Sequence, residues 1–371
     1  MTLLVIISFT IYLVWMMCYL RAWNALGTPA PLSGGSTTKI SVVVPVRNEE
    51  ENIEQLVRMV FNQNYPAGLF ECIISDDHSD DGTVPKVQQL IKKFPQLQLI
   101  LPDNLHGKKA ALARAIEIST GELVVTIDAD VSVNEHWLST IAAYYETTRC
   151  KLIILPIMMK DGNSFLEQVQ VLELLSLVGT TAAAASMHSP VMCNGANLAF
   201  SREGYNALRG YEGNASISGG DDMFLLIKQK KVSKKSIGYV HDRNAIAWTN
   251  PEKKLASLLS QRIRWASKAG RYSDAEILFL AAIVWLVNAL TVWMIVSLVL
   301  GDVPHWWALL LLILRWLVDF IFLRNVALFF HKSRVLGNYP FLLFIYPLYA
   351  TLIPLAGIFY RPSWKGRKVK H

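Results

Sequence analysis

The sequence is poor in cysteine and lacks any cysteine pattern. Its 371 residues include only four cysteines, which stand far apart at Cys18, Cys72, Cys150 and Cys193. Without a C-x-x-C pair there is neither a zinc-binding signature nor a disulfide framework. This scattered spacing predicts buried free thiols in a reducing compartment.

Internal repeats and low-complexity tracts are also missing, and charged residues make up only 18%. The lack of a repeat argues against a secondary transporter, because many transporter folds are built from internal repeats. Hydrophobic residues reach 52% and the mean hydropathy is +0.30. The apolar residues concentrate at the N-terminus and after Glu276. This distribution predicts membrane segments attached to a globular domain.

The N-terminal apolar stretch, Thr2 to Leu20, carries no charge and is followed by Arg21. Its length matches the roughly 20 residues of a spanning helix. A cleaved signal peptide is the alternative, but the stretch has no basic start and no small-residue cleavage site. We predict an uncleaved transmembrane anchor over residues 1–22, followed by a linker from Pro29 to Thr38 that is rich in Gly, Ser, Thr and Pro.

Three further apolar stretches predict membrane segments within residues 276–360. The second of them carries Arg315 and Asp319, which share one helix face at i, i+4 spacing and are expected to pair. The third contains three prolines, which argues against a straight helix. The stretches are Ile277 to Leu300, Trp306 to Leu323 and Tyr339 to Tyr360.

The distribution of positive charge predicts the orientation in the membrane. The net charge is +7, and five cations crowd a basic tail over residues 361–371, where anionic lipid headgroups fit better than nucleic acid. By the positive-inside rule, the central segment, the loop with Arg324, Lys332 and Arg334, and the tail should be cytoplasmic. Three full C-terminal crossings would put the tail outside. We therefore expect the last apolar segment to be re-entrant or interfacial.

Between the apolar ends, strands alternate with helices. This alternation predicts an α/β fold with a mostly parallel sheet covered on both faces, and ligands of such sheets bind at the carboxyl ends of the strands. The expected strands are Lys39 to Pro45, Glu71 to Ser75, Leu97 to Leu101 and Leu123 to Ile127, and the expected helices are Asn48 to Phe61, Val84 to Phe94 and Lys108 to Ser119.

Two acidic motifs follow predicted strands. Asp76 and Asp77 are placed to accept hydrogen bonds from a base N–H or from ribose hydroxyls, whereas the Ser79 to Asp81 segment is expected to build a turn and cap a helix. Asp128 and Asp130 are spaced to hold Mg²⁺ or Mn²⁺, which would neutralise a diphosphate leaving group. A solvated acidic turn is the alternative for this second motif.

Lys108 and a pair of aspartates stand at two predicted helix starts. Lys108 follows Gly107, an arrangement that suits an anionic phosphate, although a solvated lysine is the alternative. Asp221 and Asp222 follow two glycines and precede an apolar run. We expect Asp221 to act as an N-cap and Asp222 to act as the general base that deprotonates an acceptor hydroxyl.

The segment Gln261 to Trp265 lies in a predicted amphipathic helix, residues 255–268, which we expect along the membrane surface beneath the active site. On this helix Gln261, Arg264 and Trp265 share a face. The planar fork of an arginine suits a diphosphate, and the tryptophan offers a stacking wall for a sugar or an acceptor. A structural amphipathic helix is the alternative.

Three acidic motifs followed by Q-x-x-R-W resemble the signature of inverting, membrane-attached family 2 glycosyltransferases. The resemblance runs from Lys39 to about Arg271 and is to the branch with the ceramide glucosyltransferases, and more distantly to the cellulose, chitin and hyaluronan synthases. Within it, the segment Ser41 to Glu49 resembles the family's opening nucleotide-binding strand and turn, and Asn194 to Asn197 its donor-sugar loop. Trp364 to Arg367 also recurs near the C-terminus of related membrane transferases.

The resemblance implies a Rossmann-like GT-A domain over residues 39–272 that is dependent on Mg²⁺ or Mn²⁺. It makes Asp77 the uracil contact, Asp130 the chief metal ligand and Asp222 the base. The chain departs from many synthases in having Asp221 before the base where they have Glu, which leaves the helper carboxylate open. The full set of donor-binding expectations is Pro45, Glu49, Asp76, Asp77, Lys108, Asp128, Gly195, Asn197, Gln261, Arg264 and Trp265.

The predicted activity is hexosyl transfer from a UDP-sugar to a lipid hydroxyl by a multi-pass membrane protein, in the inner membrane if the source is bacterial. No nucleic-acid partner is expected. A processive polysaccharide synthase is the first alternative, although the membrane part is small for a polymer channel. The second alternative is a catalytically silent membrane scaffold.

Overall fold

In the computed structural model the chain is described over residues 2–28, 35–102, 104, 106–213, 219–269, 271–301, 305–359, 363–364 and 367–368. Most of the predicted linker and most of the basic tail lie outside these residues. The chain divides into two compact units. The sheet unit is built from Gly27–Met158 and His188–Asn250, and the helical unit from Met1–Leu26, Met159–Met187 and Pro251–Val369. The predicted catalytic segment, 39–272, therefore contributes to both units.

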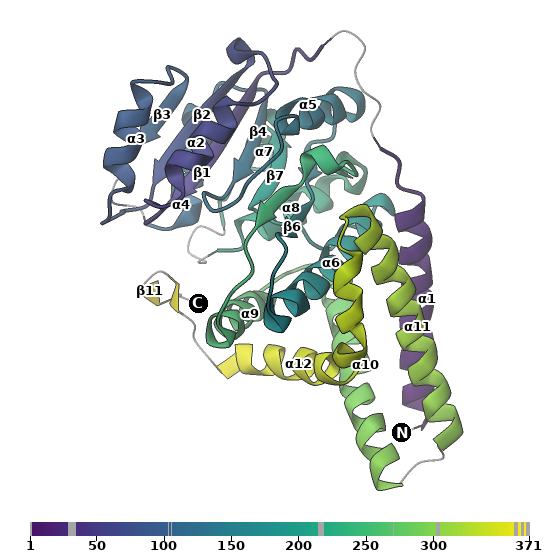
Figure 1. Ribbon diagram of the computed structural model, residues 1–371. Coiled ribbons are helices and arrows are strands. Elements are labelled where there is room, and N and C mark those ends of the chain that lie inside the picture. The colour runs from purple at the N-terminus through teal and green to yellow at the C-terminus, as the bar shows by residue number, and fades with distance from the viewer. Residues whose placement is uncertain are drawn as a thin grey trace. The chain divides into compact units, whose positions relative to one another are not determined.

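The sheet unit is organised around a seven-stranded sheet with the order β3-β2-β1-β4-β7-β5-β8 (Figure 1). The first four strands in this order are parallel, whereas β7 runs antiparallel to both β4 and β5. The sheet is therefore mixed. The strands are β1 (Ile40–Val46), β2 (Phe70–Asp76), β3 (Leu97–Ile100), β4 (Leu123–Ile127), β5 (Leu152–Ile154), β7 (Asn197–Ser201) and β8 (Ile237–Tyr239).

The centre of this sheet forms the core of the unit. Val42, Val43 and Val44 in β1 are all fully buried. Because successive strand side chains point to opposite faces, both faces must be covered, and this is why the strand reads as a continuous apolar run. The helices are α2 (Ile53–Phe61), α3 (Thr83–Ile91), α4 (Lys108–Ile118), α5 (Trp137–Thr148), α7 (Arg202–Ala207) and α8 (Asp221–Val232).

Smaller elements complete the description. A second, two-stranded sheet pairs β6 (Ile157–Met159) with β9 (Ala247–Thr249). Near the C-terminus β10 (Ser363–Trp364) pairs with β11 (Arg367–Lys368), which involves the described residues of the predicted tail motif. Short 3₁₀ helices are η1 (Ala67–Leu69), η2 (Lys234–Ser236), η3 (Arg243–Ala245) and η4 (Ser333–Asn338).

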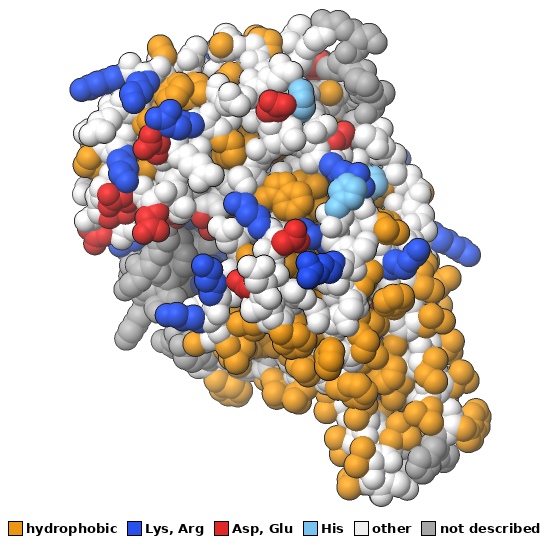
Figure 2. All heavy atoms as spheres, in the orientation of Figure 1, with side chains coloured by type: hydrophobic (Ala, Val, Ile, Leu, Met, Phe, Trp, Pro, Cys, Tyr) orange, Lys and Arg blue, Asp and Glu red, His pale blue; other side chains and the backbone are white. Residues whose placement is uncertain are grey.

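Among its described residues, the helical unit contains five helices that are long and apolar enough to cross a membrane. Four of them coincide with the predicted apolar stretches, and their hydrophobic side chains dominate the surface of this unit (Figure 2). The unit consists of α1 (Thr2–Asn24), α6 (Phe165–Ser186), α9 (Leu255–Ala269), α10 (Ala275–Leu300), α11 (His305–Phe329) and α12 (Tyr339–Phe359).

The fifth apolar helix, α6, was not expected from the sequence as a membrane helix. In its most apolar window 67% of the residues are buried inside the structure, against 22% for α1. Helix α6 begins with a capping box in which Ser164 and Glu167 exchange hydrogen bonds. Its burial explains why it is apolar around much of its surface.

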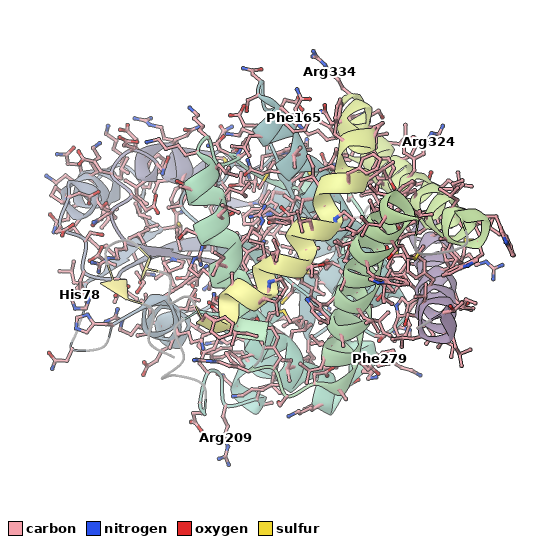
Figure 3. All side chains as sticks on the ribbon, turned by 90° about the horizontal axis from the view of Figure 1, so that it is seen from below. His78, Phe165, Arg209, Phe279, Arg324 and Arg334 are labelled. Carbon is pink, nitrogen blue, oxygen red and sulfur yellow. The ribbon has the colours of Figure 1, made fainter. Side chains whose placement is uncertain are left out.

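Helix α12 contains Pro347 and Pro354 in its interior. A proline removes one backbone hydrogen bond and bends a helix, and the ribbon of α12 changes direction along its length (Figure 1). The bend agrees with the prediction from the sequence that this segment is not a straight helix. The neighbouring Arg324 and Arg334 are exposed and point away from the helices (Figure 3).

Helices α1, α10 and α11 pack through an apolar cluster that includes Phe9, Met294 and Leu312. A polar network lies among the same helices. The predicted Arg315–Asp319 pair is confirmed, with 3.6 Å between Nε and Oδ2, and the hydroxyl of Tyr12 donates to Asp319 over 2.8 Å. Polar groups are costly inside such a helix bundle unless they are paired, and here α1 supplies one partner and α11 the others.

The cysteines are free, and Cys72, Cys150 and Cys193 are buried, as the sequence predicted. Burial raises the pKa of Cys72 to about 12, which keeps this thiol protonated and unreactive. The prediction was wrong for Cys18, which is exposed on α1. Cys18 lies on the exposed face of an apolar helix, where a thiol needs no partner within the protein.

Candidate active site

The strand register brings two acidic motifs to one edge of the sheet. Val46 in β1 pairs with Asp76 in β2, and Val43 pairs with Thr126 in β4. Because these strands are parallel, the residues that follow them emerge at the same edge. The antiparallel strand β7 begins there, with Asn197 opposite Ile127. The loop before β7 therefore meets the two acidic motifs.

Asp76 and Asp77 are almost fully buried at the end of β2, with 1% and 2% of their surface exposed. Asp77 Oδ1 accepts a hydrogen bond from the Gly107 N–H over 2.8 Å. Asp76 Oδ2 accepts one from the Ser79 N–H over 3.0 Å, whereas its buried Oδ1 has no partner among the described residues. A buried carboxylate oxygen without a donor is costly to leave unsatisfied, so a ligand donor is the natural complement at this position.

The residues after Asp77 build a turn, as the sequence predicted. Asp81 accepts hydrogen bonds from the backbone and the hydroxyl of Thr83 at the start of α3. Ser79 accepts from the Asn48 N–H, and Asp80 accepts from the Asn48 side chain. These contacts join the loop after β2 to the loop after β1, which fixes the position of Asp77.

Lys108 forms an ion pair with the second acidic motif. Its Nζ lies 2.6 Å from Asp128 Oδ1. Burial opposes the charge of the lysine, but Asp128 and Asp221 outweigh that effect and raise its pKa above the usual value. The lysine therefore stays positively charged among carboxylates. The sequence predicted Lys108 as a phosphate ligand but gave no sign of this pairing.

Asp130 lies two residues further along and has an exposed side chain. Desolvation by the neighbouring protein atoms raises the pKa of Asp130 to about 6, and the negative charges of Asp128 and Glu49 act in the same direction. The neighbouring negative charges thus disfavour the ionised form of Asp130.

Asp222 joins this edge through the loop before β7. Its Oδ2 accepts a hydrogen bond from the Gly195 N–H over 2.9 Å, and Oδ1 accepts one from the Met223 N–H over 2.8 Å. Thr126 in β4 donates its hydroxyl to the Gly195 carbonyl over 3.3 Å. These contacts connect β4, the Gly195 loop and the start of α8, and they fix the orientation of the Asp222 carboxylate.

Gly195 occupies the centre of the cluster. A Cβ at this position would lie 3.0 Å from Asp221 Oδ2 and 3.6 Å from Lys108 Nζ. The glycine is thus required by the close approach of three functional side chains. The sequence assigned Gly195 to donor binding, and the structure adds this spacing role.

The expectation that Asp221 is an N-cap was wrong. Gly220, with a φ of +71°, is the N-cap of α8, and Asp221 is the first residue of the helix. Two successive glycines with positive φ turn the chain sharply before the helix. Both aspartates therefore lie in the first turn, where the helix dipole favours negative charge.

Asn197, predicted to contact the donor, is fully buried and hydrogen-bonded within the protein. Its Nδ2 donates to the carbonyls of Pro156 and Ala245, and its Oδ1 accepts from the Trp137 indole. These contacts favour a role in supporting the loop. Pro45, also predicted to contact the donor, is half-buried near the end of β1, where it pairs in register with Ser75 next to the acidic pair.

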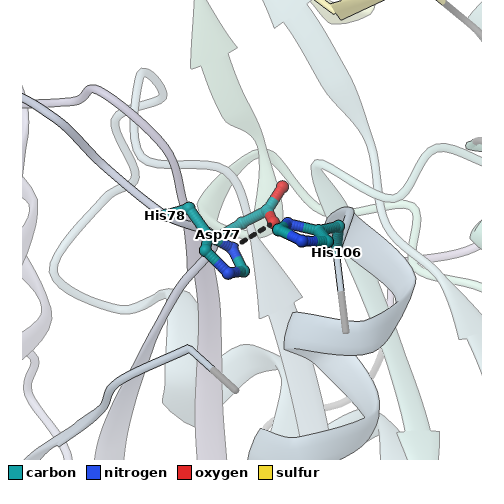
Figure 4. Close-up of side chains that lie close together, drawn as sticks. All are labelled: Asp77, His78 and His106. Atoms are coloured by element: carbon teal, nitrogen blue, oxygen red, sulfur yellow. Dashed lines mark hydrogen bonds and ion pairs between the residues drawn. The ribbon is translucent and has the colours of Figure 1, made fainter. Parts of the chain in front are cut away.

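Asp77 also belongs to a cluster with His78 and His106 whose ligand atoms lie close enough together for a metal ion (Figure 4). One ligand atom from each of the three residues lies within 4.8 Å of the others. The two imidazole rings are stacked, however, with centroids 3.9 Å apart. Because imidazole lone pairs lie in the ring plane, stacked rings do not aim at one ion, and Asp77 Oδ1 is already bonded to Gly107.

The predicted Gln261, Arg264 and Trp265 face lies on α9, which belongs to the helical unit. The expected helix, residues 255–268, is confirmed as Leu255–Ala269. The sequence missed Arg262, which is buried and forms an ion pair with Glu173 in α6. Arg262 occupies an unspecified position of the Q-x-x-R-W motif, so the motif alone assigns it no role.

Comparisons with known proteins find similar sequences and one similar fold. Residues 41–208 match glycosyl transferase family 2. Glycosyltransferase AglE of Haloferax volcanii is 34% identical over 99 residues, which are 27% of this chain and 33% of the relative. Beta-monoglucosyldiacylglycerol synthase of Trichormus variabilis is 31% identical over 114 residues, or 30% of this chain and 24% of the relative. The matches thus span a third or less of these curated relatives.

A solved structure resembles the whole chain. It is the mannosyltransferase PcManGT from Pyrobaculum calidifontis, in complex with GDP-Man and Mn²⁺. The TM-score is 0.61 at 20% sequence identity, over 94% of this chain and 98% of that protein. This likeness concerns the fold. Together with the mixed sheet, it shows a GT-A-like α/β fold, and the segment within this fold that matches glycosyl transferase family 2 is residues 41–208.

Proposed function

We propose that the protein transfers a hexose from a UDP-sugar to the hydroxyl group of a membrane lipid, with inversion at the anomeric carbon. The observation that carries this proposal is the convergence of Asp77, Lys108, Asp128 and Asp222 at one sheet edge. Asp77 would contact the nucleoside, and Lys108 would supply a positive charge. Asp128 would bind the metal ion, and Asp222 would act as the base. The glycolipid synthase among the relatives and the long apolar helices support a lipid acceptor.

The donor would be bound by its nucleoside and its diphosphate. Asp76, with an unpartnered buried oxygen, and Asp77 suit the N–H and hydroxyl donors of a uridine. Lys108 suits the diphosphate because it is held charged among carboxylates. A GDP-sugar is the competing donor, since the donor of PcManGT is GDP-Man.

The residues of the second acidic motif fit a divalent cation. Asp130 is exposed, and Asp128 uses one oxygen for Lys108 and makes no hydrogen bond through the other among the described residues. These are the hard oxygen donors that Mg²⁺ and Mn²⁺ prefer. When bound, the cation would neutralise negative charge on the UDP leaving group.

Asp222 would remove the proton from the acceptor hydroxyl. The acceptor oxygen then bonds to the anomeric carbon from the side opposite UDP, the bond from that carbon to the phosphate oxygen breaks, and UDP leaves with the electron pair. The backbone donors Gly195 and Met223 hold the carboxylate in one orientation for this step. A hydrogen-bonded, positioned base is the geometric requirement for general-base catalysis.

The test is to incubate the purified membrane protein with Mn²⁺, lipid vesicles and a panel of UDP- and GDP-sugars. Lipid extraction and mass analysis then identify the product. We expect one added hexose on a lipid with one UDP-sugar. A ladder of products would instead support a polysaccharide synthase, and no product with any donor would support a silent scaffold.

We further propose that the protein is a multi-pass membrane protein with the site on the cytoplasmic side. The five long apolar helices support insertion. The exposed Arg324 and Arg334 support the orientation, because they follow the positive-inside rule. The interfacial position of α9 is part of the same proposal.

A further inference from the structure

The buried ion pair between Arg262 and Glu173 lies inside the helical unit and takes no direct part in the proposed reaction. Nε and Nη2 of Arg262 both lie 2.8 Å from Glu173 Oε2. The two side chains are only 4% and 11% exposed. A buried ion pair contributes little net stability, since desolvation offsets the attraction. Its presence therefore calls for another role.

Arg262 contacts two residues of the Q-x-x-R-W motif. Its Nη1 donates to Gln261 Oε1, and its guanidinium lies over the Trp265 ring at 4.3 Å from the centroid. This hydrogen bond fixes the orientation of the Gln261 amide, with its oxygen facing the arginine. The ring contact holds one face of the tryptophan, because a guanidinium stacks favourably on an indole.

Further contacts fix the two ends of this network. The hydroxyl of Tyr349 in α12 donates to Glu173 Oε1 over 3.1 Å. The Gln261 amide nitrogen points to Glu252 Oε1 at 3.5 Å. Gln170 in α6 exchanges hydrogen bonds with the backbone of Glu252 over 2.8 and 2.9 Å. Helices α6, α9 and α12, which are labelled in Figure 1, thus all contribute to the network.

We propose that the Arg262–Glu173 pair is the positioning element of the Q-x-x-R-W motif. It fixes the side-chain conformations of Gln261 and Trp265 that the motif presents to the donor diphosphate and to the acceptor. This inference rests on the proposed function for what the motif binds. The positioning itself is a property of the helical unit alone.

The chemistry of the pair makes distinct variants informative. Glu173→Gln leaves the arginine buried without a counter-charge, so the guanidinium must turn away from its partners. Arg262→Lys retains the charge opposite Glu173 but loses the planar fork, which is needed to reach Glu173 and Gln261 at once and to stack on Trp265. The lysine variant therefore separates charge from positioning.

The first measurement follows the indole directly and needs no substrate. Protein containing 5-fluorotryptophan is examined by ¹⁹F NMR, and the Trp265 resonance is assigned from its loss in Trp265→Phe. We expect this resonance to shift or broaden in both Arg262→Lys and Glu173→Gln. An unchanged resonance in both variants would overturn the positioning role, whatever the activity.

The second measurement compares sugar transfer with UDP affinity. Misplacement of a binding group by about 1 Å costs roughly 10²-fold in rate, so we expect kcat for Arg262→Lys to fall by about that factor and UDP affinity to change much less. The Tm of this variant should remain close to that of the wild type. Normal kcat at normal Tm would contradict the proposal.

Asp161→Asn is the matched control. It breaks another ion pair of the helical unit, in which Lys332 Nζ lies 2.5 Å from Asp161 Oδ1. We expect it to leave both the Trp265 resonance and the transfer rate unchanged. Equal losses in this control would show that general destabilisation causes the effects of the Arg262 and Glu173 variants, and would overturn the positioning role. If the resonance shifts as expected but the wild type transfers no sugar, the proposed function fails while the positioning role stands.

Discussion

At the residue scale, Lys108 has the most informative surroundings. It is paired with Asp128, and the negative charges of Asp221 and Asp222 also raise its pKa and favour its charged form. The second and third acidic motifs therefore converge with reduced mutual repulsion, because the charge of Lys108 lies between them. The cation that we propose at Asp128 and Asp130 would share this carboxylate cluster with the lysine.

Loss of the cation should weaken donor binding. EDTA is expected to abolish turnover because it removes the divalent cation. Asp130→Asn should lower UDP affinity in the presence of Mn²⁺, because the cation that would coordinate the phosphate oxygens is held less well. UDP titration by calorimetry with and without Mn²⁺ measures both effects. A variant that binds UDP with the wild-type Mn²⁺ dependence would remove Asp130 from the metal site.

Asp222→Asn should lower kcat by about 10²–10⁴-fold, which is the usual contribution of a general base. UDP affinity should be retained, because the proton transfer involves the acceptor. Asp242→Asn is the control, since Asp242 is an acid outside this cluster that accepts from the Asn244 N–H. Similar losses in both variants would contradict a specific role for Asp222.

Glu71 offers a prediction about stability. Burial alone would raise its pKa, but hydrogen bonds from Ser41 and Thr120 outweigh burial and lower the pKa below the usual value. A carboxyl group with a lowered folded-state pKa stabilises the fold above its unfolded pKa and loses this contribution as the pH falls through the folded value. Glu71→Gln should thus cost about 1–3 kcal/mol at neutral pH.

The measurement is Tm as a function of pH for the wild type and Glu71→Gln. The difference should be constant at neutral pH and should shrink below pH 4.5, the ordinary value for this group. A difference that does not depend on pH in that acidic range would show that the charge of Glu71 is not responsible.

At the element scale, much of the fold was predictable because the strands have strong patterns. The stretch Leu123–Ile127 was predicted with its observed bounds, since a short apolar run ending at an acidic motif is unambiguous. Helix α2 begins only at Ile53 rather than at Asn48. The polar residues before it bond to the neighbouring loop instead, as Asn48 does with Ser79.

Other features of the elements were not predictable from the sequence. The antiparallel direction of β7 depends on how the chain returns to the sheet, and no residue pattern encodes it. The partners of Asn197 lie 41, 48 and 60 residues away in sequence, so its structural role was hidden. The same holds for Glu173, which lies 89 residues from Arg262.

Helix α9 carries the prediction for the Q-x-x-R-W motif. Trp265→Ala should impair transfer more than UDP binding, because we propose that the indole walls the acceptor pocket. Arg264→Ala should damage both, because its guanidinium would balance the diphosphate charge. UDP affinity and transfer rate are measured side by side for each variant. Near-normal transfer by both variants would show that α9 is only a structural amphipathic helix.

At the scale of the whole molecule, the chain combines a GT-A-like α/β sheet unit with a unit of long apolar helices. The family 2 match covers residues 41–208, whereas the apolar helices are spread over both ends and α6. Such a combination suits a soluble donor and a membrane-bound acceptor. It also explains why composition alone indicated a membrane protein with a globular part.

The central claim is inverting transfer of a hexose from a UDP-sugar to a lipid, and the anomeric configuration of the lipid product tests it most directly. Purified protein is incubated in lipid vesicles with Mn²⁺ and an α-linked UDP-sugar, and the extracted glycolipid is examined by NMR at the anomeric position. The account predicts a single β-linked hexose on the lipid. An α-linked product, or UDP release with no sugar on the lipid, would contradict it.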